Sequence, residues 1–267
     1  MLVSSVIAVG CGSSKKKALV CSNDDAGAVA VAGKEGADPT GSGDAGPPRD
    51  AGGAPVDASG DAPRATSGAA AITQEIDREL GLIRSTAYSH ETQVDERAGT
   101  FNVDCSGFLN YVLERAVPAQ YEAFHAATTS RPLAKDYANY MNALPSGAPR
   151  DGWRRVTRAI DLVPGDMVGW VLNPDSNNGD SGHVVFVSGA VGINADRADE
   201  VLVPVTDATW HAHGTIDPRS KSKSGGIGTG GMIGILIDGN GAPKGYRWNG
   251  GCGPDQGSAV LSMGHVD

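Results

Sequence analysis

The chain has 267 residues, with 22 Lys and Arg against 31 Asp and Glu, and only 5% of its residues are aromatic. Because the net charge is −9 and the sequence has no basic stripe, we expect no nucleic-acid partner bound through phosphate contacts. No apolar run approaches the roughly 18 residues of a membrane-spanning helix, which excludes a multi-span membrane protein.

Residues 1–11 are an apolar stretch that ends in small residues directly before Cys11. This pattern is typical of the end of a secretory signal, and it resembles a bacterial lipobox, in which cleavage before the cysteine leaves a thiol that becomes lipid-modified. Gly10 supplies the small residue at the cut, whereas the usual positive charges before the apolar run are missing. We expect lipidation at Cys11 and membrane attachment by this lipid anchor only; the alternative is an ordinary apolar N-terminus.

Residues 12–72 are rich in Ala, Gly, Asp, Pro and Ser and contain no Phe, Trp or Tyr. A segment with so little apolar surface to bury does not offset the entropy lost on ordering, so we expect a disordered linker. All aromatic residues lie in 73–267, a length sufficient for one hydrophobic core. The sequence therefore predicts a signal segment over 1–11, a linker over 12–72 and one domain over 73–267.

The first half of this domain has helical periodicity. Apolar residues spaced by four and three predict a helix over 76–83 with Thr73 as its cap, and a polar loop follows. A second helix is predicted from Cys105 to about residue 117, where Pro118 ends it. The third helix is predicted over 132–144, with a proline at its first position.

The second half of the domain consists of short β-branched runs bounded by turn residues. The predicted strands cover 167–172, 183–188, 201–206, 232–237 and 245–248. The glycine-rich run 225–231 lacks the lysine of a phosphate loop, and we expect a flexible connection there. Helices followed by closely spaced strands indicate an α+β fold with helices packed on an antiparallel sheet.

Cys105 is the leading candidate for chemistry. A cysteine in the first turn of a helix faces unpaired backbone N–H groups and the positive end of the helix dipole, which favour a thiolate. In chain order it is followed by His183, at the start of a predicted strand, and by Asp207, at the end of the next strand. A thiol, an imidazole and a polar orienting group are the set that nucleophilic thiol catalysis needs.

Three motifs carry a family resemblance: Asp-Cys-Ser-Gly-Phe at 104–108, Pro-Gly-Asp-Met-Val at 164–168 and Gly-His-Val at 182–184. With them, residues 84–210 resemble the NlpC-type papain-like cysteine peptidases of bacterial cell walls. The resemblance implies the papain-like NlpC-type fold, a nucleophile at Cys105 and a base at His183.

The same resemblance implies a third catalytic group on the strand that follows the histidine strand, which is Asp207. It also matches the family's tyrosine to Tyr88, and we expect Tyr88 and Ser106 to contact the substrate. Either His211 or His213 is an alternative for the third group. The resemblance implies no metal and no organic cofactor.

A metal site formed by His211, His213 and Asp217 is a weaker hypothesis, because a histidine pair at i and i+2 lacks a fixed third partner. The four cysteines have no CxxC pair and no metal-ligand spacing, so they support neither a metal site nor a particular disulfide. Arg219 and Arg247 are interpreted as surface residues, with contact to an anionic substrate as the alternative. The remaining histidines are interpreted as surface residues: His90, His125 and His265.

The sequence thus predicts a cysteine-dependent amide hydrolase, a monomer that acts on peptidoglycan peptides in the bacterial cell envelope and is lipid-anchored or secreted. Two alternatives remain. One is a thiol amidase or acyltransferase that acts on another amide or on lipid. The other is a non-catalytic envelope-binding module that keeps the fold, in which Cys105 need not be reactive.

Overall fold

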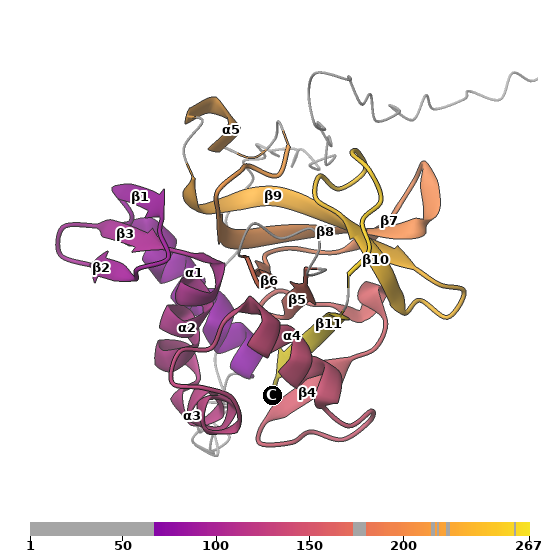
Figure 1. Ribbon diagram of the computed structural model, residues 1–267, viewed down its shortest axis with the longest axis horizontal. Helices are drawn as coiled ribbons and strands as arrows, with labels where there is room; N and C mark the ends of the chain where they lie inside the picture. The colour runs from indigo at the N-terminus through magenta and orange to yellow at the C-terminus, as the bar shows by residue number, and fades with distance from the viewer. Residues whose placement is uncertain (1–66, 173–179, 215–216, 218, 223–224, 259) are drawn as a thin grey trace, which may run out of the picture.

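The computed structural model describes residues 67–172, 180–214, 217, 219–222, 225–258 and 260–267 (Figure 1). The predicted signal segment with Cys11, and the predicted linker up to residue 66, lie outside the described residues. None of the described helices has the length and apolar character needed to cross a membrane. The predicted α+β class is confirmed, because four helices in the first half of the domain pack beside a large antiparallel sheet.

Helix α1 (Gly68–Leu82) begins earlier than predicted, inside the range assigned to the linker. Its cap is Ser67, whose side chain accepts a hydrogen bond from the backbone of Ala70. Thr73, the predicted cap, instead lies within the helix and donates its hydroxyl to the carbonyl of Ala69. The apolar face of α1 is buried in the core, so this helix is an integral part of the domain.

Helices α2 (Cys105–Ala116), α3 (Pro118–Ala127) and α4 (Ala134–Ala143) follow. The predicted bounds of α2 agree with the structure to within a residue or two. Pro118 does end α2, but it also begins α3, because a proline is tolerated where the first N–H of a helix has no partner.

A small sheet occupies the segment predicted as a polar loop. It contains β1 (Ser85–Tyr88), β2 (Gln93–Asp95) and β3 (Thr100–Val103), in the order β1-β3-β2. The strands have three or four residues each, too few for an alternation of apolar and polar residues to be detected in the sequence. Tyr88 pairs with Val103, so this sheet places Tyr88 close to the start of α2.

The large sheet has eight strands, with β7 paired to β8 beside the main path β10-β9-β8-β6-β5-β11-β4. The strands are β4 (Trp153–Val156), β5 (Met167–Val171), β6 (Gly182–Val187), β7 (Gly192–Asn194), β8 (Arg197–Thr209), β9 (Gly226–Ile237), β10 (Pro243–Arg247) and β11 (Val260–Val266). All pairings are antiparallel. The five predicted strands are present, and the sequence missed β4, β7 and β11.

Side chains on the two faces of this sheet form two cores. On β6, Val184 and Phe186 pack with the helices, whereas Val185 and Val187 pack on the other face. The ring of Phe108 in α2 meets the ring of Phe186 edge-on, with centroids 5.8 Å apart. This contact fixes the start of α2 relative to β6, the two elements that carry Cys105 and His183.

Candidate functional site

The first turn of α2 is held by Asp104. Its Oδ1 accepts hydrogen bonds from the backbone N–H of Gly107 at 2.6 Å and from the hydroxyl of Ser106 at 2.9 Å. Its Oδ2 lies 3.3 Å from a guanidinium nitrogen of Arg131. A Cβ at Gly107 would lie 2.7 Å from the hydroxyl of Thr92 and 3.2 Å from Oδ1 of Asp104, so a larger residue would displace these side chains. The Asp-Cys-Ser-Gly run therefore builds a rigid N-terminal cap.

Cys105, the first residue of α2, is a free thiol and is almost fully buried. Burial raises the pKa of the thiol, and the negative charge of Asp104 raises it further. The backbone N–H groups of Val184 and Ser106 act in the opposite direction but do not compensate. The low thiol pKa expected from the helix position alone is therefore wrong, because burial and the charge of Asp104 outweigh the backbone N–H groups.

His183 is the second residue of β6, where it pairs with Trp170 of β5. Gly182 precedes it with a positive φ, and a Cβ there would lie 2.0 Å from the carbonyl oxygen of Trp170. Only glycine fits this close approach, which explains the first residue of the Gly-His-Val motif.

Nε2 of His183 lies 2.6 Å from Oδ2 of Asp207, and both side chains are buried. An ionised carboxylate can only accept, so Nε2 carries the proton and Nδ1 is left as the basic nitrogen. Burial lowers the pKa of His183, and the hydrogen bond and charge of Asp207 raise it only in part. No hydrogen bond joins His183 to the Cys105 thiol among the described contacts.

Asp207 belongs to a buried cluster that the sequence analysis did not assemble. Its Oδ2 also lies 2.9 Å from Nε2 of His213, and its Oδ1 accepts a 2.9 Å hydrogen bond from Arg219. Arg219 also binds Asp217, at 2.7 Å, and the backbone carbonyl of Gly226. The carboxylates of Asp207 and Asp217 thus both contact the guanidinium of Arg219, and Asp207 also contacts the imidazole of His213. These contacts limit the free-energy cost of burying the charges.

The ring of His213 is completely enclosed. Its Nδ1 lies 3.0 Å from the carbonyl oxygen of Trp248, and its Nε2 faces Asp207. Both neighbours are hydrogen-bond acceptors, so the ring of His213 lies between two acceptor oxygens. Burial alone would raise the pKa of Asp207, but the charge of His213 and the hydrogen bonds from His183 and His213 lower it well below its usual value.

The glycine-rich run 225–231 lies largely within β9, so the predicted flexible connection is wrong. A Cβ at Gly228 would lie 2.5 Å from Nε of Arg219, and one at Gly231 would lie 2.9 Å from Oδ2 of Asp217. The absence of side chains therefore makes room for the buried cluster. The pairing of β8 with β9 also shifts register just before Asp207. Such a β-bulge changes the direction in which a nearby side chain points.

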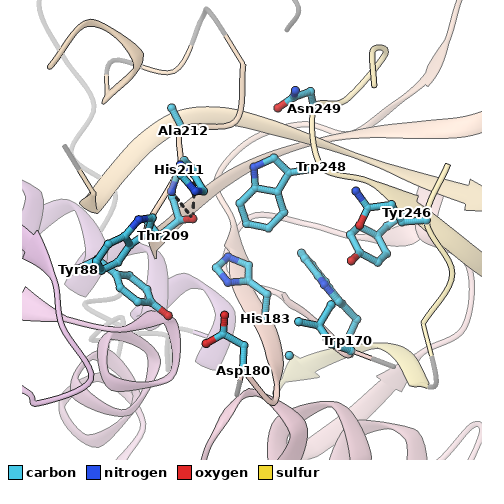
Figure 2. A pocket seen from close by; sticks show the side chains of 14 residues that line it. Tyr88, Trp170, Asp180, His183, Thr209, His211, Ala212, Tyr246, Trp248 and Asn249 are labelled. Atoms are coloured by element: carbon cyan, nitrogen blue, oxygen red, sulfur yellow. Dashed lines mark hydrogen bonds between the residues drawn. The ribbon is translucent and has the colours of Figure 1, made fainter. Parts of the chain in front are cut away.

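Two adjoining pockets contain the candidate residues. One, of about 490 Å³, is lined by His183 and by several aromatic side chains (Figure 2). The other, of about 100 Å³, is lined by Cys105 and Ser106. Tyr88, Asp180 and Gly182 line both pockets. The thiol and the imidazole therefore face neighbouring parts of one depression between α2 and the start of β6.

Several sequence predictions need correction. Arg219 and Arg247 are not solvated surface residues, because Arg219 is buried in the cluster and Arg247 pairs with the buried Glu200 at 3.2 Å. His265 is largely buried and contacts Asp166 of the Pro-Gly-Asp motif at 2.6 Å.

Three of the remaining candidate residues line the pockets. Tyr88 lines both pockets, Ser106 lines the smaller one and His211 lines the larger one. The Ser106 hydroxyl is directed to Asp104. His211 is exposed, and it is not among the hydrogen-bond partners described for Asp207. Cys252, which lines neither pocket, is disulfide-bonded.

The donor atoms of His183, Asp207 and His213 lie within 4.8 Å of one another and could in principle hold a metal ion. A tetrahedral site with ligand bonds of about 2.1 Å separates its ligands by about 3.4 Å. The observed separations of 2.6 and 2.9 Å between ring nitrogens and carboxylate are those of hydrogen bonds. The three side chains are therefore arranged as a hydrogen-bonded group.

Comparisons with known proteins do not place the chain in a family: no family model, curated protein or solved structure matches it significantly. The chemistry of the site must therefore be argued from its own residues.

Proposed function

We propose that the domain is a cysteine-dependent amide hydrolase with Cys105 as nucleophile, His183 as base and Asp207 as orienting group. The buried 2.6 Å contact between His183 and Asp207, at the edge of the depression that also contains Cys105, is the observation that carries this proposal. It fixes the tautomer that leaves Nδ1 free to take a proton.

The shifted pKa values favour a resting pair of neutral thiol and neutral imidazole. Substrate binding would bring the groups into reach, and His183 would take the thiol proton as the sulfur attacks the carbonyl carbon. The same proton would then pass to the leaving amine as the C–N bond breaks. Water would hydrolyse the thioester and restore the thiol.

The developing oxyanion needs donors close to Cys105. The backbone N–H groups at the start of α2 are suitable, because the positive end of the helix dipole lies there. Tyr88 lines the same pocket, and burial raises the pKa of its phenol, so the hydroxyl stays protonated and can donate. This supports the expected role of Tyr88 at the substrate.

The proposed substrate is a peptidoglycan peptide, on the strength of the resemblance to NlpC-type peptidases. The enzyme would act as a monomer without a cofactor in the cell envelope, secreted or held by a lipid on Cys11. The burial that raises the pKa of Cys105 also fits the competing hypothesis of a non-catalytic envelope-binding module, which has no need of a reactive thiol.

Labelling with a peptidyl chloromethyl ketone at pH 8, mapped by peptide mass analysis, separates these hypotheses. We expect modification at Cys105 that is at least about tenfold slower in His183→Gln, a change that keeps a donor toward Asp207 but removes the base. His265→Gln is the matched control, because that histidine lies away from the depression. Equal rates in the wild type and His183→Gln would indicate a structural thiol and favour the binding module.

A further inference from the structure

The larger pocket beside His183 has a wall of aromatic rings (Figure 2). Its aromatic residues are Tyr88, Trp170, Trp210, Tyr246 and Trp248. A volume of about 490 Å³ falls in the range of small-ligand sites and is enough for a long side chain of a bound peptide. Because His183 belongs to the same pocket, a group bound here would lie next to the bond that is attacked.

The rings stand in two groups on either side of the pocket. The Trp170 ring lies against that of Tyr246, with centroids 4.5 Å apart, and meets Trp248 edge-on at 6.1 Å. On the other side Tyr88 and Trp210 are in edge contact at 5.5 Å. Trp210 is 63% exposed, although large apolar side chains are usually covered. Trp170 and Tyr246 are themselves buried, so the aromatic surface that a ligand could cover belongs to Trp210 and to the half-buried Tyr88 and Trp248.

The polar groups of the pocket are dominated by acceptors. Asp180 contributes an exposed carboxylate. Oδ1 of Asn249 is buried and has no hydrogen-bond partner among the described residues, and a donor from a ligand would remove the cost of leaving it unpaired. Neither lysine nor arginine is found among the described residues that line the pocket. An anionic ligand would therefore meet a carboxylate without a compensating cation.

We propose that this pocket binds an alkylammonium side chain of the substrate. Aromatic faces attract cations, most strongly when water is displaced, and Asp180 adds the opposite charge. The ammonium N–H groups would supply the donor that Oδ1 of Asn249 lacks, while the alkyl stem covers the rings. The inference extends the proposed hydrolase function by naming the charge of the group beside the scissile amide.

Binding can be measured without turnover in the full-length Cys105→Ala protein, by titration calorimetry and by tryptophan fluorescence. The probes are the Nα-acetyl methylamides of lysine, norleucine and glutamate, which share a backbone and differ in side-chain charge. We expect the lysine compound to bind at least fivefold more tightly than the norleucine compound, and the glutamate compound to bind most weakly.

Asp180→Asn should weaken binding of the lysine compound by about two- to fivefold and leave the norleucine compound unchanged. Asp77→Asn, the same change at an exposed position of α1, should have no effect. Equal or tighter binding of the norleucine or glutamate compound would overturn the proposal, as would failure of the lysine compound to bind or insensitivity to Asp180→Asn. Labelling of Cys105 is independent of these outcomes, so the pocket and the thiol reaction can fail separately.

Discussion

His213 and Asp207 form a fully buried pair in which Nε2 of the histidine lies 2.9 Å from Oδ2 of the carboxylate. The same oxygen contacts His183, so a single carboxylate lies between two imidazoles. Of these two histidines, His183 lines the larger pocket, whereas His213 is fully buried and is not among the lining residues. In the proposed reaction His213 would position Asp207 and would not itself contact the substrate.

The first prediction concerns this positioning. His213→Leu should lower kcat by about tenfold or more with little change in KM, because Asp207 would lose a partner and hold His183 less firmly. His213→Gln should recover part of the loss, since its amide can donate to Asp207. Steady-state kinetics on folded variants, checked by circular dichroism, test this. Identical kcat values for the Leu variant and the wild type would show that Asp207 needs no support from His213.

The second prediction uses the pH dependence of kcat/KM. Burial lowers the pKa of His183, so the base stays neutral, and the enzyme active, to a pH below the usual histidine value of about 6.5. Asp207 acts in the opposite direction on this pKa. Asp207→Asn should therefore lower kcat and also move the acid limb to lower pH. An acid limb that moves to higher pH would contradict this electrostatic role.

Asp207→Ala should cost less activity than Cys105→Ala, because an orienting group makes no bond to the substrate. His211→Ala should cost less than Asp207→Ala, since His211 is exposed and lines the pocket, whereas the described hydrogen bonds of Asp207 go to His183, His213 and Arg219. Rate constants for the three variants, measured on one substrate, provide the ranking. A larger loss for His211→Ala than for Asp207→Ala would mean that the orienting residue is wrongly assigned.

The thiol itself gives a fourth prediction. Because burial and the charge of Asp104 raise the pKa of Cys105, iodoacetamide should label it slowly at pH 6 and faster as the pH rises above 8. Asp104→Asn keeps a good helix cap but removes the charge, so it should increase labelling at neutral pH. The Glu91→Gln variant controls for a general change of charge nearby. Rapid labelling of the wild type at pH 6 would contradict this prediction and indicate the thiolate that the helix position alone favours.

A fifth prediction concerns Glu79 of α1, which is fully buried and whose carboxylate oxygens have no hydrogen-bond partner among the described residues. Burial, with the nearby charge of Glu75, raises its pKa to about 8. The folded protein then binds this proton more tightly than the unfolded chain, so the free energy of unfolding falls as the pH rises from about 4.5 to 8.

Glu79→Gln should remove this part of the pH dependence, and the exposed Asp77→Asn should leave it in place. Urea unfolding at pH 5 and pH 8 measures the difference for each variant. If the wild type and Glu79→Gln show the same pH dependence, Glu79 is ionised in the folded protein.

The sequence predicted the elements whose patterns are long enough to detect. Helix α2 and the cores of β5, β6 and β8 have strong apolar periodicity, and each carries or borders a candidate residue. Strands such as β2, with three residues, leave no such pattern. The prediction that Pro118 ends α2 is confirmed, but the sequence analysis missed α3, because a proline can both end one helix and begin the next.

The candidate site was predicted residue by residue but not as an assembly. Cys105, His183 and Asp207 follow from motifs and their order, whereas the buried cluster depends on long-range pairing between β8 and β9. The signal for that cluster was present in Gly228 and Gly231, whose missing side chains make room for charged groups. A glycine-rich run inside a strand marks close packing as well as flexibility.

The most direct test of the central claim is mass analysis of purified peptidoglycan fragments after digestion with the wild type and with Cys105→Ala. The proposed mechanism predicts that the wild type cleaves a peptide amide, giving products with the mass of one added water, and that Cys105→Ala gives none above background. Full hydrolytic activity in Cys105→Ala would contradict the mechanism. Intact fragments with both proteins would contradict the proposed substrate.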